Sequence, residues 1–230
     1  MVTLLNLASY LIPIIFFLAF SLKKAGWELW VIFFYVLLSL ATDILIMRSN
    51  FGQQHSNQFI GLFTICEFTI FAAFFIASIT KKPLRRIVQI VSILVLLFLV
   101  YSYFNSSNEK FDSIAGSTES VTLIAFSVVF LFGEINKPLP YDMYASPNFW
   151  IILAILIYMA STLFLFIIAS DLTDQEKGKY WIINSISSII SNVIFGIGFF
   201  KGRKLGQNSI FEKSSFEYHD IPENHRKLEP

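Results

Sequence analysis

The sequence predicts an all-α polytopic membrane protein, a bundle of seven transmembrane helices. Composition is the first reason: 55% of the residues are hydrophobic and only 14% are charged, whereas soluble domains carry about 25% charged residues. The mean hydropathy of +0.65 agrees with this class. The apolar residues also form blocks long enough to cross about 30 Å of hydrocarbon, which takes about 20 helical residues. In lipid such blocks must satisfy their own backbone hydrogen bonds, so we expect helices and not strands.

Seven blocks of this length follow one another along the chain. They cover residues 4–22, 27–47, 57–80, 87–104, 118–135, 148–170 and 180–200. The first block has no Lys or Arg before Lys23 and no small-residue cleavage site after it, so we expect a retained helix and not a signal peptide. We predict one transmembrane domain, residues 1–200, followed by a cytoplasmic tail, 201–230. The tail mixes both charges with few apolar residues, which is typical of disorder.

The basic residues predict the orientation, because Lys and Arg gather on the cytoplasmic side of membrane proteins. With seven spans, the C-terminal side holds all but four of the 17 Lys and Arg residues, the four being Arg48, Lys110, Lys177 and Lys179. We therefore expect the N-terminus outside and the C-terminus in the cytoplasm. The four Trp residues lie at the ends of predicted spans, as an interfacial aromatic belt requires.

Most spans carry polar side chains at helical spacing on one side, and only the fourth, which contains "SILVLLFLV", is mostly apolar all round. They are Asn6, Ser9, Tyr10 and Pro13 in the first span, Tyr35, Ser39, Thr42 and Asp43 in the second, Glu119 and Thr122 in the fifth, Tyr158, Ser161 and Thr162 in the sixth, and Asn184, Ser187, Ser188, Ser191 and Asn192 in the seventh. These faces are expected to turn toward a shared interior that is open to the outside.

Glu67 lies within the apolar run "GLFTICEFTIF", residues 61–71 of the third span. A carboxylate inside a membrane costs a few kcal/mol even on lenient scales, so we interpret Glu67 as functional. A rise of about 1.5 Å per residue puts it about 15 Å below the outer surface, level with Tyr158 and Ser188. We expect hydroxyls and amides of the sixth and seventh spans to hold it. With no cation at its depth, Glu67 is expected to be protonated at neutral pH.

Together these patterns predict a polar ligand pocket. Its candidate residues are Tyr10, Asp43, Thr64, Glu67, Tyr158, Ser161, Thr162, Asn184, Ser188, Ser191 and Asn192. The structural alternative for any single Ser or Thr is a bond to the preceding turn or to a neighbouring helix, worth about 0.6 kcal/mol. Asp43 and Glu119 lie nearer the interface, where we interpret them as solvated helix-end residues. Glu119 in a first helical turn would also suit the helix dipole.

Other kinds of site are disfavoured by what the spans lack. No span contains Lys, which excludes a retinal Schiff base, and His55, His219 and His225 lie outside the spans, which excludes the zinc site of seven-helix hydrolases. There is no phosphate-binding Gly-rich loop, no HExxH, no GxSxG and no membrane-embedded Ser–Lys pair. We expect no catalytic residue, no metal and no cofactor. Cys66 is interpreted as a small apolar residue.

Three segments carry a family resemblance: "SNQFIGLFTICEFTIF" (56–71), "NFWIILAILIYMASTLFLFI" (148–167) and "WIINSISSIISNVIFGIGFFKG" (181–202). They resemble an uncharacterised family of bacterial seven-helix integral membrane proteins. The resemblance marks six signature positions: Asn57, Glu67, Trp150, Tyr158, Trp181 and Asn192. It implies the fold and the bacterial cytoplasmic (inner) membrane, and it implies no activity.

The predicted function is a non-enzymatic module that binds or senses a ligand or a proton. A tail of this length is too short for an output domain, so we expect a separate cytosolic or membrane signalling partner, besides the lipid bilayer, and no nucleic acid. The main alternative is a small-solute transporter or proton-coupled permease, which needs a second access route at the inner end. An intramembrane enzyme is a third alternative, and it needs two acids near one substrate atom.

Overall fold

The fold is that of a computed structural model, which describes residues 2–22, 25–48, 56–105, 113–136, 143–169 and 182–202. Its helices are α1 (Val2–Ser9), α2 (Leu11–Phe16), the π-helical η1 (Phe17–Ser21), α3 (Trp27–Arg48), α5 (Ser56–Ser78), α6 (Lys82–Asn105), α7 (Ser113–Ile135), the 3₁₀ turn η2 (Met143–Ala145) and α8 (Pro147–Ala169). A last helix covers Ile182–Gly202. The described residues contain no strand. Among the described residues, seven helices are long and apolar enough to cross a membrane, which confirms the predicted all-α class and the number of helices of spanning length.

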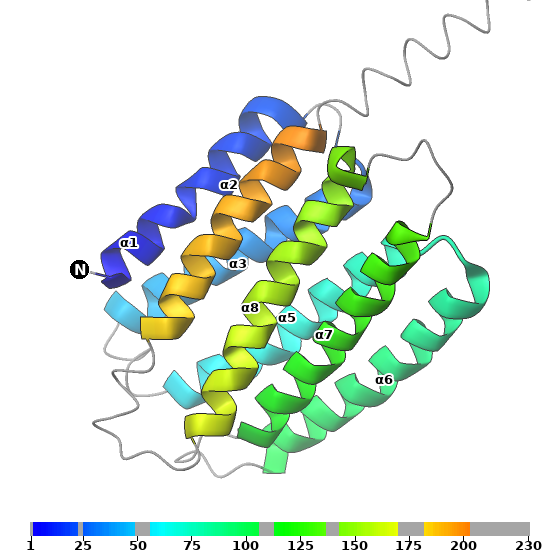
Figure 1. The fold of residues 1–230 in the computed structure, drawn as a ribbon. Coiled ribbons are helices and arrows are strands. Elements are labelled where there is room, and N and C mark those ends of the chain that lie inside the picture. The colour runs from blue at the N-terminus through cyan, green and yellow to red at the C-terminus, as the bar shows by residue number, and fades with distance from the viewer. Residues whose placement is uncertain are drawn as a thin grey trace, which may run out of the picture.

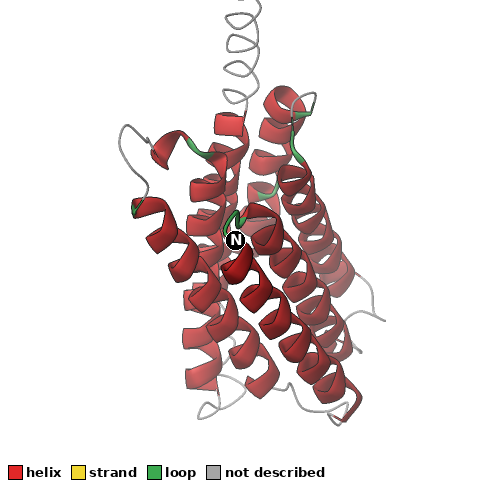
Figure 2. Ribbon diagram, turned by 90° about the vertical axis from the view of Figure 1, so that its right-hand side faces the viewer, coloured by secondary structure: helices red, strands yellow, loops and turns green. Residues whose placement is uncertain are grey.

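The helices lie side by side in a bundle, with the N-terminal helices and α6 at opposite edges (Figure 1). Among the helices from α1 to α8, packing is closest between α7 and α8, α3 and α5, and α5 and α6. Figure 2, turned by 90°, shows the helices running along one common direction. We call the end where α1 begins and α3 ends the N-terminal end, and the end where α5 ends and α6 begins the opposite end.

Two helices begin five residues before the apolar blocks that predicted them. α6 begins at Lys82 and not at 87, and α7 begins at Ser113 and not at 118. Pro83 is tolerated in the first turn of α6, where its missing N–H would have no partner anyway. Hydropathy marks only the part of a helix that suits hydrocarbon, so polar first turns fall outside the blocks. The early start of α7 changes the place of Glu119 in its helix.

The first span contains a break. α1 ends at Ser9, α2 begins at Leu11, and Tyr10 forms a turn between them. Pro13 explains the break, because its ring lacks an N–H and clashes with the carbonyl four residues earlier, that of Ser9. Just before the break, the Ser9 hydroxyl donates to the Asn6 carbonyl at 2.7 Å. Tyr10, at the break, is buried in the bundle.

The half of the bundle toward the opposite end is filled by aromatic side chains. Phe17 stacks on Phe33 with ring centroids 4.1 Å apart, and it meets Phe199 edge-on at 5.1 Å. The rings of Phe74 and Phe75 are also fully buried. Such interlocked rings form a dense core, because edge-to-face and offset pairs fill space with little void.

The lateral surface is apolar, most of all on α6. Only 17% of the α6 span is buried, against 28–39% for the other spans. Ile90, Ile93, Leu94 and Leu97 are all more than half exposed. A continuous apolar face of this size suits contact with acyl chains. The tail at 203–230, Trp181 and the side chain of Asn57 lie outside what the structure describes, so the predictions made for them stay predictions.

Candidate ligand-binding pocket

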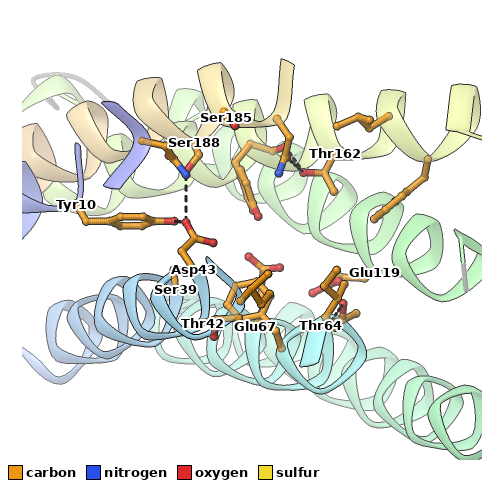
Figure 3. Close-up of a pocket in the computed structure, with 18 of the residues that line it drawn as sticks. Tyr10, Ser39, Thr42, Asp43, Thr64, Glu67, Glu119, Thr162, Ser185 and Ser188 are labelled. Carbon is orange, nitrogen blue, oxygen red and sulfur yellow. Dashed lines mark hydrogen bonds between the residues drawn. The ribbon is translucent and has the colours of Figure 1, made fainter. Parts of the chain in front are cut away.

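A cavity of about 410 Å³ lies in the N-terminal half of the bundle (Figure 3). Its polar lining comes from every span except α6: Asn6 and Tyr10 in the first, Ser39, Thr42 and Asp43 on α3, Thr64 and Glu67 on α5, Glu119 on α7, Tyr158 and Thr162 on α8, and Asn184, Ser185 and Ser188 on the last helix. The volume falls within the range of about 300–1,000 Å³ typical of pockets for small molecules. The polar faces of separate helices therefore meet around one space.

Most of the residues predicted for the pocket line this cavity. They are Tyr10, Asp43, Thr64, Glu67, Tyr158, Thr162, Asn184 and Ser188. Ser161, Ser191 and Asn192 do not. The Ser191 hydroxyl donates to the Ala154 carbonyl of α8 at 3.1 Å, and the Asn192 amide donates to the Ser9 hydroxyl at 2.8 Å. Ser191 and Asn192 thus join neighbouring helices below the cavity. This is the structural alternative that the sequence left open for single polar residues in the spans.

Glu67 is 4% exposed, and its side chain lines the cavity. Its Oε1 accepts a hydrogen bond from the Tyr35 hydroxyl of α3 at 2.8 Å. The sequence had predicted support from the sixth and seventh spans, but this donor belongs to the second. Tyr158 and Ser188, from the spans first expected, line the same cavity without a recorded bond to Glu67. The long Tyr35 side chain bridges the packed pair α3 and α5.

Asp43 ties the first span to α3. Its Oδ2 accepts from the Asn6 amide at 3.1 Å and from the Tyr10 hydroxyl at 3.0 Å (Figure 3). Asn192 extends this network through Ser9, whose hydroxyl in turn donates to the backbone of Asn6. Asp43 is half-buried five residues before the end of α3, and beyond the solvated role interpreted from the sequence its carboxylate also holds two helices together.

The solvated, helix-end position predicted for Glu119 is wrong. Glu119 is 3% exposed and lines the cavity, although we expected a solvated residue in a first helical turn. Because α7 begins at Ser113, Glu119 lies nearly two turns inside the helix, about 9 Å at 1.5 Å per residue. The Thr118 and Thr122 hydroxyls donate to carbonyls four residues earlier, so both are satisfied within the helix.

The Glu119 carboxyl is also incompletely satisfied. Its Oε1 is buried and has no hydrogen-bond partner among the described residues. Glu119 and Glu67 both turn toward the cavity in Figure 3. None of the described residues lining the cavity is Lys, Arg or His, so three carboxyl groups share it without a basic partner. Within the described ranges, no three His, Cys, Asp or Glu side chains are grouped to hold a metal ion.

Beyond the cavity, toward the opposite end, the bundle is packed with aromatic rings. The ring of Tyr35, whose hydroxyl meets Glu67, lies 4.4 Å from that of Phe71 and 6.0 Å from that of Phe195, centroid to centroid. Both Phe rings are buried and lie toward the opposite end. The polar lining therefore gives way to the aromatic core at the level of Tyr35.

No protein-family model, curated protein or solved structure matches the chain.

Proposed function

We propose that the protein is a non-enzymatic receptor of the bacterial cytoplasmic membrane, which binds a small polar or protonatable ligand in this cavity. The observation that carries the proposal is a polar cavity in the N-terminal half of the bundle that reaches Glu67, with the packed rings of Tyr35, Phe71 and Phe195 beyond it. A polar cavity that ends at packed aromatic rings suits reversible occupancy. Ligand binding would shift the helices that line it, and a separate partner protein would respond to that shift.

The aromatic packing beyond the cavity favours this function over transport. A transporter must open its central site to each side in turn. Toward the opposite end, most buried side chains below Glu67 are apolar, among them the fully buried rings of Phe17, Phe74 and Phe199, although Ser21, Ser127 and Glu134 are buried there too. A passage there would have to separate stacked aromatic rings and would expose few polar groups to a passing solute. Transport is therefore the second candidate.

An intramembrane enzyme is the third candidate. Its sequence criterion was a pair of acids near one substrate atom, and Glu67 and Glu119 do line the same cavity. Paired carboxyls suit general acid–base chemistry. None of the described residues that line the cavity is Cys, Lys or His, and this favours binding over catalysis.

The described basic residues support an orientation with the cavity facing outward. Lys81, Lys82, Arg85 and Arg86 lie at the opposite end, and so does Lys201 at the end of the last helix. In a membrane this end would face the cytoplasm. The partner that receives the signal would then meet the cytoplasmic end, away from the cavity.

The test combines binding with flux. The full chain in lipid nanodiscs is screened against small polar and amphiphilic molecules by thermal stabilisation, and each stabilising molecule is then followed into proteoliposomes. We expect ligands whose binding is weakened by Glu67→Gln and which are not taken up. Glu134→Gln is the matched control, because Glu134 is a buried acid on α7 outside the cavity lining. Saturable uptake that depends on Glu67 would favour the transporter instead, and turnover of the molecule would favour the enzyme.

A further inference from the structure

The charges that line the cavity restrict what it binds. Asp43, Glu67 and Glu119 supply three carboxyl groups, and none of the described lining residues is basic. An anionic ligand would meet acids, hydroxyls and amides, without a cation to compensate its charge. In a site of low dielectric constant such a pairing is costly. The cavity therefore selects against anions.

The hydrogen bonds of the cavity leave acceptors in excess. Asp43 receives two donors and Glu67 receives one. Three atoms of the lining are buried and have no partner among the described residues: Glu119 Oε1, Asn6 Oδ1 and the hydroxyl oxygen of Ser39, which can both donate and accept. A buried acceptor left without a donor costs about 1–3 kcal/mol. Unpaired acceptors thus outnumber unpaired donors here, and a ligand that brings donors would satisfy them.

The rest of the wall is apolar. Ile60 and Phe63 of α5 face the cavity together with Leu165 and Phe166 of α8. These side chains suit a hydrocarbon or aromatic body, and the rings also favour a nearby cation. A water molecule occupies about 30 Å³ in the liquid, so a cavity of about 410 Å³ exceeds what a proton or a single small ion needs.

From these three properties we infer that the ligand is a small organic amine in its ammonium form. The ammonium group carries three donors and no acceptor, and it would bind at Glu119 and Glu67. The hydrocarbon part would lie against Phe63, Leu165 and Phe166. This inference rests on the proposed function, since it names the class of ligand for the same cavity.

The test compares amines with isosteric neutral and anionic molecules. The full chain in nanodiscs is titrated at neutral pH with ethylamine, butylamine and phenethylamine, each beside the corresponding alcohol, and with phenylacetate. We expect at least one amine to bind tenfold or more tightly than its alcohol, and phenylacetate to be the weakest. Glu119→Gln should reduce the amine-to-alcohol preference at least fivefold, because the amine loses a charged partner and the alcohol does not. Glu134→Gln should change neither affinity.

The outcomes separate the inference from the proposed function. Equal affinity of amines and alcohols, tighter binding of phenylacetate, or binding of none of these amines at millimolar concentration would each overturn the amine inference. An amine preference that survives Glu119→Gln would also overturn it. The receptor proposal itself fails only if the broad ligand screen yields no molecule whose binding depends on Glu67.

Discussion

Replacing Tyr35 by Phe tests the hydrogen bond between the Tyr35 hydroxyl and the Glu67 carboxyl. The substitution removes the hydroxyl that donates to Glu67 Oε1 at 2.8 Å, and it keeps the ring that packs against Phe71 and Phe195. Tyr35 is 5% exposed and Glu67 is 4% exposed, so solvent cannot readily replace the lost donor. The two residues come from different helices, and the bond therefore contributes to packing of α3 on α5.

The expected cost follows from this burial. A buried acceptor that loses its donor costs about 1–3 kcal/mol, whereas hydrogen bonds between membrane helices average about 0.6 kcal/mol and reach about 1.7 kcal/mol. Because Glu67 faces a polar cavity with Thr64 and Tyr158 in its wall, partial replacement is available, and we expect a loss of about 1 kcal/mol. Tyr35→Ala should cost about 3–5 kcal/mol, since it also removes the ring from the core.

The assay is reversible unfolding of the full chain in mixed micelles, with a double-mutant cycle. Tyr35→Phe, Glu67→Gln and the double variant are compared with Tyr101→Phe, a control at a residue that is 67% exposed. We expect coupling of about 0.5–1 kcal/mol between the two buried positions. The reasoning is refuted if Tyr35→Phe is as mild as Tyr101→Phe and the cycle shows no coupling.

Two further predictions concern the cavity and the orientation. Gly116→Ala should weaken ligand binding and lower the free energy of unfolding by about 1–3 kcal/mol, because the new Cβ would overlap the ring of Phe166, which lines the cavity. Unchanged ligand affinity and unfolding midpoints would contradict this, since they would mean that the Phe166 ring moves aside without cost. In intact cells carrying Cys66→Ser, an impermeant thiol reagent should label Ser185→Cys directly and Lys81→Cys only after permeabilisation, because they lie at opposite ends. The reverse pattern would invert the proposed orientation.

The seven spans could be predicted because hydropathy and length are properties of local sequence. Helical spacing then predicted which face of each helix is polar, and Tyr10, Asp43, Glu67 and Asn184 do line one cavity. Spacing gives the side of a helix and not its depth in the packed bundle. Asn192 follows the same stripe as Asn184, yet it lies two turns further along and joins helices through Ser9.

The hydrogen-bond partner of Glu67 and the start of α7 depend on how the helices pack, which the spacing of residues along one helix does not show. The partner of Glu67 is set by the rotation of α3 against α5, which brings the Tyr35 hydroxyl within reach. Glu119 was misplaced because "SIAGSTES", residues 113–120, is rich in residues that also favour loops. Packing of α7 on α8 overrides this preference and starts the helix at Ser113. Burial of Glu119 follows from that earlier start.

The central claim is that acids from three helices share one ligand-binding space inside the bundle. A high-resolution electron cryo-microscopy structure of the full chain in a nanodisc, with a bound antibody fragment as a marker, tests it most directly. The account predicts a cavity bounded by Asp43, Glu67 and Glu119, with non-protein density in contact with the Glu119 carboxyl. A Glu67 side chain that faces lipid, or a cavity closed by aliphatic side chains, would contradict it.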